Sequence, residues 1–202
     1  MAEERRLTYF VAATVDGFIA GPDGSDPSGP GGFWPVTDDY IAFLASAYPE
    51  TLPVAAREAL GISGEPEQFD TVLEGRRSYE IGLAAGVADA YPHLRHLVFS
   101  TSLEQLPSAE VELVRTDPVQ RVRALKAEAG RGIWLVGGGT LASALRAEID
   151  ELIVKLSPIT IGAGIPLWGG GAAFGVEAWT RSDVTALPGG TTVLRYARTR
   201  EE

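Results

Sequence analysis

Short apolar segments recur along the chain and are separated by polar, glycine-rich or helix-forming stretches. Runs rich in β-branched and aromatic residues predict strands at residues 6–13, 71–74, 97–100, 111–115, 133–136 and 152–157. Helical spacing and helix-start signals predict helices at 38–48 and 118–129, a short helix at 53–60, and further helices that begin at 75 and directly after the glycines 137–139. The last two apolar segments, 176–187 and 191–199, flank Pro188-Gly189-Gly190 and predict a hairpin. This alternation predicts an α/β fold with a mostly parallel sheet and a C-terminal antiparallel hairpin.

One long stretch, 14–32 (TVDGFIAGPDGSDPSGPGG), is too rich in Gly, Pro, Asp and Ser for a regular element. Long irregular segments inside compact domains are typically functional, so we expect a loop over a site. We find no internal repeat and no composition break, which predicts one domain over residues 1–202.

Composition and charge narrow the possible partners. The 202 residues carry a formal net charge of −10, which disfavours nucleic acid and anionic membranes as partners. There is no cysteine, which excludes disulfides and thiolate chemistry. No apolar run has the length of a membrane span, and the first residues lack a signal-peptide pattern, so we expect a cytoplasmic protein.

The segment IWLVGGGTL, residues 133–141, joins a predicted strand to a predicted helix through three glycines. Glycines there can expose backbone N–H groups to a phosphate, or they can simply allow a tight turn and close packing. Neither a P-loop nor a G-x-G-x-x-G sequence in the required context is present.

A second strand-to-helix junction has similar chemistry. Strand 71–74 enters Gly75, Arg76, Arg77 and Ser78, where two guanidinium groups and a hydroxyl could hold a phosphate. The alternative is a solvated arginine pair. Two such junctions would suit a ligand with separated phosphate groups, such as NADP.

Several ordered segments together resemble the dihydrofolate reductase-like family, in particular the riboflavin-biosynthesis reductase domain and its stand-alone relatives. They are VAATVDGFIAGPDG, DTVLEGRRSYE, LVFSTSL, IWLVGGGTL and DELIVKLSPITIGAGIPLW, and they span nearly the whole chain. The resemblance implies a three-layer α/β/α fold, NADP as cofactor, and a homodimer.

The resemblance also implies residue roles. Gly75, Arg76, Arg77 and Ser78 would hold the pyrophosphate and 2′-phosphate side, and Ser100 and Thr101 would lie near the adenosine. Gly137, Gly138, Gly139, Thr140 and Leu141 would hold the pyrophosphate and nicotinamide ribose. Ala12 and Ile19 would contact the nicotinamide amide through their backbone.

On the substrate side, the segment WPVTDDYIAF resembles the folate-enzyme segment in which a buried aspartate faces the pterin. That resemblance makes Asp39 a candidate proton relay and places Trp34 and Phe43 in the substrate site. The alternative is that Asp39 only stabilises the start of the helix.

The two histidines, His93 and His96, form H-x-x-H without cysteine or a nearby carboxylate pair. We interpret them as surface residues and expect no metal site.

The leading hypothesis is an NADPH-dependent reductase of a small heteroaromatic substrate, pterin-like or ribosyl-amino-pyrimidine-like. The alternatives are an NADP-binding module or sensor without turnover, and an unrelated α/β binding domain.

Overall fold

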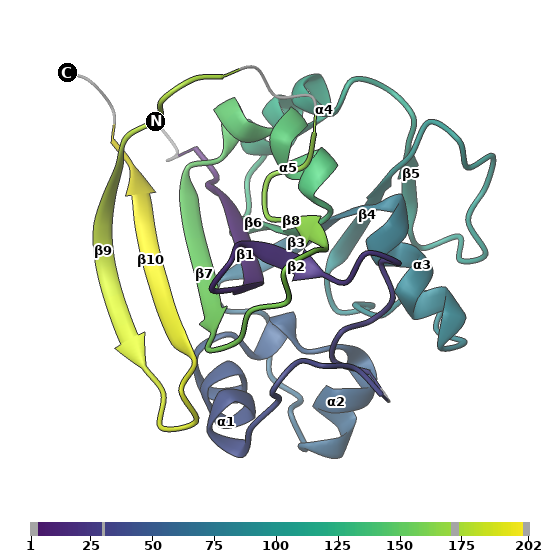
Figure 1. Cartoon of the computed structure of the whole chain (residues 1–202). Helices are drawn as coiled ribbons and strands as arrows, with labels where there is room; N and C mark the ends of the chain where they lie inside the picture. Colours follow the sequence, from purple (N-terminus) through teal and green to yellow (C-terminus); the bar gives the residue numbers. More distant parts are fainter. Residues whose placement is uncertain (1–3, 30, 171–173, 200–202) are drawn as a thin grey trace.

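The structure, a computed structural model, describes residues 4–29, 31–170 and 174–199. Eight strands form one sheet in the order β5-β4-β3-β6-β1-β7-β10-β9 (Figure 1). In chain order these strands are β1 (Leu7–Thr14), β3 (Phe69–Gly75), β4 (Arg95–Phe99), β5 (Glu112–Val114), β6 (Gly132–Gly137), β7 (Glu151–Ser157), β9 (Trp179–Ala186) and β10 (Thr192–Arg198). A second, two-stranded sheet pairs β2 (Phe18–Ala20) with β8 (Ile165–Pro166).

Strand pairing confirms the predicted mixed sheet. The strands from β5 to β7 all pair in parallel, and β10 is antiparallel to both of its neighbours, β7 and β9. The C-terminal hairpin predicted around Pro188–Gly190 is therefore the antiparallel edge. The short pair β2–β8 was not predicted, because three-residue and two-residue strands are too short to show an alternating pattern.

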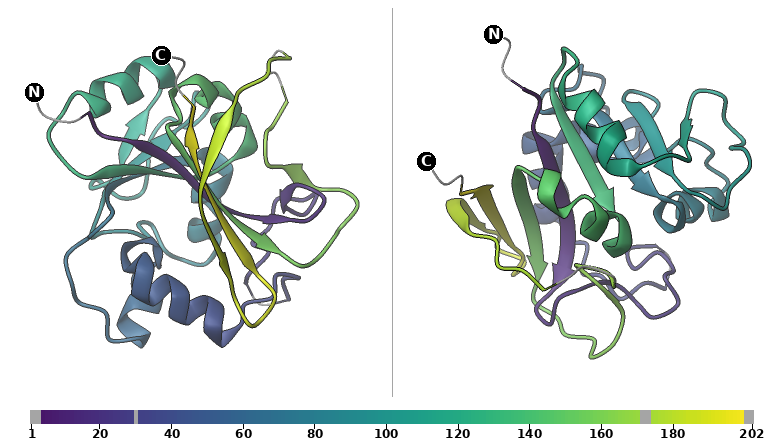
Figure 2. Two further views of the ribbon diagram at one scale, coloured as in Figure 1. Left: turned by 90° about the vertical axis from the view of Figure 1, so that its left-hand side faces the viewer. Right: turned by 90° about the horizontal axis from the view of Figure 1, so that it is seen from above.

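Helices cover both faces of the sheet. Helices α4 (Pro118–Lys126) and α5 (Gly139–Ala144) pack on one face, with the short helix η2 (Arg146–Glu148) beside them. The other face carries α1 (Asp38–Ala47), η1 (Pro49–Thr51), α2 (Val54–Ala59) and α3 (Arg76–Ala84). In the left view of Figure 2 the strands cross the middle of the molecule and α1, in blue, lies below them.

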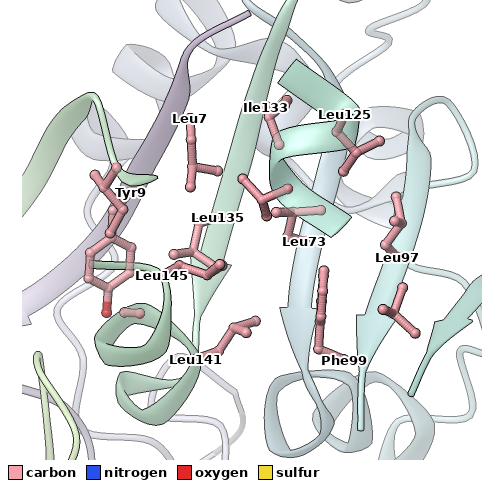
Figure 3. Packing of buried hydrophobic residues seen from close by; sticks show 14 of the residues in the cluster. Leu7, Tyr9, Leu73, Leu97, Phe99, Leu125, Ile133, Leu135, Leu141 and Leu145 are labelled. Carbon is pink, nitrogen blue, oxygen red and sulfur yellow. The ribbon is translucent and has the colours of Figure 1, made fainter. Parts of the chain in front are cut away.

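The largest apolar core lies between the sheet and helices α4 and α5. Leu73, Leu97, Ile133 and Leu135 of the central strands are fully buried there. Figure 3 shows them directed toward Leu125 of α4, together with Leu141 and Leu145. Strand β6 (GIWLVG) is buried on both faces and is a continuous apolar run, whereas the buried polar residues Thr71, Glu74 and His96 interrupt this pattern in β3 and β4.

Helix α4 begins as the sequence predicts. Asp117 accepts a hydrogen bond from the Val119 N–H at 2.9 Å, and Pro118 occupies the first turn. Within the described residues, every helix is too short or too polar to cross a bilayer.

Candidate functional site

A cleft of about 920 Å³ opens where the carboxyl ends of the parallel strands meet. Parallel pairing brings Gly75 of β3 beside Phe99 of β4 and brings Glu74 beside Gly137 of β6. Ligands of open α/β sheets bind at this edge, because the strands end there and the loops that follow them diverge.

One side of the cleft, called here the glycine–arginine side, consists of the segments that follow β3, β4 and β6. Every residue that the sequence assigned to the cofactor lines the cleft, and all of them except Ala12 and Ile19 belong to this side. They are Ala12, Ile19, Gly75, Arg76, Arg77, Ser78, Ser100, Thr101, Gly137, Gly138, Gly139, Thr140 and Leu141.

The three glycines after β6 serve different purposes. Gly138 has φ +91°, a conformation that side chains rarely adopt. A Cβ on Gly139 would lie 2.4 Å from the Pro166 carbonyl oxygen, so this glycine allows the chain at 166–169 to pack closely. A Cβ on Gly137 would meet only Ser78 Oγ, at 3.7 Å. Backbone conformation therefore explains Gly138, close packing against the chain at 166–169 explains Gly139, and Gly137 leaves open space facing Ser78.

The two arginines at the start of α3 differ in their partners. Arg76 donates to Glu80 across 3.3 Å on its own helix, and both side chains are exposed. Arg77 is exposed and makes no hydrogen bond or ion pair with any residue that the structure describes. Arg77 is thus the guanidinium group more available to a ligand.

The opposite side of the cleft, called here the aromatic side, lies between the sheet and α1. Phe10, Trp134 and Lys155 from the strands line the cleft together with Tyr40, Ile41 and Leu44 of α1. The Trp134 indole N–H donates to the Phe10 carbonyl at 3.1 Å, which fixes the ring in the wall. Burial raises the pKa of Tyr40 to about 12, so its hydroxyl stays protonated at neutral pH.

Lys155 is the charged group on the aromatic side. It lies on β7 opposite Ala12 of β1, and its Nζ is 3.6 Å from the centre of the Phe10 ring. Burial lowers the pKa of Lys155 to about 7. We did not predict a role for Lys155 from the sequence, although a lysine inside the apolar run LIVKLS is a pattern that could have revealed it.

Described residues of the segment 14–32, which we expected to lie over a site, line this cleft together with residues just after it, although the segment contains the short strand β2 as well as irregular chain. Gly24, Pro27, Ser28, Trp34 and Val36 are among the lining residues. Trp34 is buried and lines the cleft, so its position fits the substrate-side prediction.

Asp39 and Phe43 lie elsewhere. The Asp39 carboxylate accepts a hydrogen bond from the Gly189 N–H at 2.9 Å, which joins the start of α1 to the turn of the C-terminal hairpin. This hydrogen bond lowers the pKa of the Asp39 carboxyl. Phe43 packs against Tyr48, with ring centroids 5.8 Å apart. Neither residue lines the cleft. The structure therefore gives Asp39 a position that suits the helix-start interpretation.

Our interpretation of His96 as a surface residue was wrong, because its side chain is buried. Its Nδ1 lies 2.9 Å from Asp89 Oδ1 and its Nε2 lies 3.0 Å from Glu74 Oε2. Burial opposes protonation of the ring, but the hydrogen bonds and charges of these two carboxylates outweigh it and raise the pKa of His96.

His93 Nε2 is 2.8 Å from the Glu50 carbonyl oxygen. Among the described residues, no group of three or more His, Asp or Glu side chains is arranged to hold a metal ion.

Comparisons with known proteins agree with this architecture. A model of the RibD C-terminal domain family matches residues 62–193. The chain is 28% identical over 167 residues to uncharacterized protein YwjB of Bacillus subtilis (strain 168), covering 82% of this chain and 83% of that protein. It is 24% identical over 179 residues to uncharacterized protein YyaP of the same organism, covering 82% and 81%.

Two solved structures share the fold. A Shewanella sp. PV-4 protein named for riboflavin biosynthesis superposes with a TM-score of 0.66 at 20% identity, covering 96% of this chain and 99% of that one. A Thermotoga maritima diaminohydroxyphosphoribosylaminopyrimidine deaminase/5-amino-6-(5-phosphoribosylamino)uracil reductase gives 0.62 at 16% identity, covering 97% of this chain and 57% of that one.

The chain therefore belongs to the RibD C-terminal domain family and has the dihydrofolate reductase-like α/β fold of its structural neighbours. The resemblance found in the sequence is confirmed at this level.

Proposed function

We propose that this chain, as one domain over residues 1–202, is an NADPH-dependent reductase of a small heteroaromatic substrate, pterin-like or ribosyl-amino-pyrimidine-like. The observation that supports it most is the division of one cleft into a glycine–arginine side and an aromatic side. A dinucleotide needs phosphate donors and room beside the backbone, and a flat ring needs apolar walls.

The residues present fit NADPH. Gly75 and Gly137 leave the strand ends without side chains, and a Cβ on either would have no neighbour closer than 3.7 Å. Ser78, Ser100 and Thr101 add hydroxyl groups, and Arg77 adds a guanidinium group that can contact the 2′-phosphate in a bidentate manner. When bound, NADPH would supply a hydride. The chain's own residues would then orient the substrate, exclude water and provide the proton.

A second candidate function, an NADP-binding module or sensor without turnover, has one observation in its favour. Among the described residues that line the cleft, none is Asp, Glu or His. Reductases commonly use such a group, directly or through water, to protonate the substrate. The two candidates differ in whether another residue supplies that proton.

Turnover distinguishes them. The protein would be incubated anaerobically with NADPH and a panel of pterins, aminopyrimidine flavin precursors and small carbonyl compounds, and loss of NADPH absorbance would be compared with product formed. A reductase oxidises one NADPH for each product molecule. Tight NADPH binding with no reduction of any panel member would favour the module.

The homodimer and the cytoplasmic location remain part of this proposal. The edge strand β9 is exposed along most of its length, including Val184, and offers a surface for a second copy. Sedimentation of the purified protein would test the dimer.

A further inference from the structure

Lys155 is a buried cation for which the described residues provide no compensating anion. The residue is 7% exposed, and its side chain makes neither a hydrogen bond nor an ion pair with the described residues. The contact found for its ammonium group is the face of the Phe10 ring. An unpaired charge in an apolar wall costs stability, and a ligand atom that accepts a hydrogen bond from the ammonium group would offset this cost.

The neighbouring titratable groups do not neutralise Lys155. Glu151, four residues earlier on the same face of β7, binds Arg195 of β10 at 2.7 Å and accepts from the Thr8 hydroxyl of β1 at 3.2 Å. Tyr40 of α1 and Tyr91 also line the cleft, and burial raises the pKa of both, so they remain uncharged.

The rest of the chain shows how unusual this lysine is. The sequence contains two lysines, and the other, Lys126, is ion-paired with Asp150 and donates to the Glu148 carbonyl oxygen at 2.6 Å. Lys155 lines the cleft, whereas Lys126 does not. A buried ammonium group that finds no acceptor in the described part of the chain, beside a cleft with aromatic walls, is available to an acceptor on a ligand.

We propose that Lys155 binds the carbonyl oxygen of a planar, conjugated ring substrate on the aromatic side and gives that oxygen a proton as the ring is reduced. This inference rests on the reductase function proposed above. The aromatic walls of Phe10 and Trp134 favour a flat ring, and the ammonium group favours an oxygen that becomes negative during reduction.

The proposed step balances with a reduced nicotinamide as the reductant. Addition of a hydride to the ring carbon β to the carbonyl forms a C–H bond, and the electron pair of the C=C bond shifts to make an enolate. An N–H bond of Lys155 breaks as the enolate oxygen takes the proton, which leaves a neutral amine and an enol. Water at the mouth of the cleft returns a proton to the amine, and the enol converts to the saturated carbonyl compound.

Burial supports this role by bringing the proton affinity of Lys155 close to neutral. A lysine whose pKa is about 7 exists in both forms at the pH of the cell, and such a group gives up and regains a proton readily. The absence of acidic side chains among the described cleft residues leaves Lys155 as the group best placed to donate this proton.

The test uses two bicyclic probes of similar shape. Coumarin carries a conjugated carbonyl, and naphthalene has no oxygen. Binding of each to the cofactor-free protein would be measured by ligand-observed NMR for wild type, Lys155→Met and Arg181→Met. Arg181 is exposed on β9 and outside the cleft, so its variant removes the same charge elsewhere.

We expect wild type and Arg181→Met to bind coumarin more tightly than naphthalene, by a factor of about ten or more. One charge-assisted hydrogen bond to the carbonyl oxygen would produce a difference in affinity of this size. Lys155→Met should lose that preference and keep its affinity for naphthalene. A preference for coumarin that persists in Lys155→Met, or no coumarin binding by wild type, would overturn the proposal.

A second readout needs no variant. Limited acetylation of wild type, followed by peptide mass spectrometry, compares Lys155 with Lys126 in the same sample. Coumarin should protect Lys155 and leave the labelling of Lys126 unchanged. Equal labelling of Lys155 with and without saturating coumarin counts against the proposal.

NADPH binding, measured on the same three proteins, separates this inference from the reductase function. If NADPH does not bind but the coumarin preference depends on Lys155, the cofactor assignment fails and the lysine site stands. If NADPH binds equally to all three and Lys155→Met keeps the coumarin preference, the lysine site fails and the cofactor assignment stands.

Discussion

Replacing Lys155 by methionine should stabilise the protein at neutral and acidic pH. Methionine carries no charge, and its side chain is of similar length to that of lysine. It can therefore pack against Phe10 without leaving a cavity. Burial lowers the pKa of Lys155 from 10.5 to about 7. At about 1.36 kcal/mol for each pKa unit, the folded protein loses about 4–5 kcal/mol by keeping Lys155 charged, as an upper estimate.

The pH dependence of this effect has a definite sign. Because the pKa of Lys155 is lower in the folded protein, the unfolded chain binds a proton that the folded protein lacks between pH 7 and 10.5. The free energy of unfolding of wild type therefore rises with pH in that range, by about 1.36 kcal/mol for each pH unit from this group. The advantage of Lys155→Met should be largest below pH 7 and should shrink as the pH rises to 10.5.

Urea unfolding followed by tryptophan fluorescence, at about pH 6, 7.5 and 9, measures both quantities. Comparing Lys155→Met with wild type cancels the contributions of groups common to both, including His96. Arg181→Met serves as the control for net charge. The reasoning is refuted if Lys155→Met is less stable than wild type at pH 6, or if the difference in stability does not change with pH.

The remaining predictions concern the cofactor and Asp39. Arg77→Ala should reduce the preference for NADPH over NADH about tenfold or more, and Arg76→Ala should reduce it less because Glu80 already engages Arg76; equal losses in competition titrations would contradict this. Gly137→Ala should keep the circular dichroism of wild type and weaken NADPH binding, whereas a variant at Gly138 would strain the backbone by itself; unchanged affinity would show that no ligand lies against Gly137. Asp39→Asn should leave NADPH affinity and turnover unchanged and lower the melting temperature slightly, and a large fall in kcat would restore Asp39 as the proton donor.

The sequence predicted the glycine–arginine side because its signals are local. Glycine, arginine and hydroxyl residues directly follow apolar strands, and parallel pairing brings the ends of such strands to one edge. The same signals could not separate the purposes of the three glycines, since the close approach to Gly139 comes from Pro166, far along the chain.

The positions of Asp39 and Lys155 depend on contacts that the sequence does not show. The sequence around Asp39 fits both a helix-start residue and a buried acid. Its hydrogen-bond partner Gly189 could not be predicted, because it lies 150 residues away along the chain. The position of Lys155 depends on the register of β7 with β1, which turns its side chain toward Phe10 rather than toward the opposite core. A shift of one residue would have exposed Val154 to the cleft instead.

Titration of the purified protein with NADPH, followed by the fluorescence of the bound cofactor, tests the central claim most directly. The account predicts saturable binding of NADPH to wild type, about tenfold or more tighter than that of NADH, and loss of this preference in Arg77→Ala but not in Arg181→Ala. Equal affinity for NADPH and NADH, or no binding of either, would contradict it.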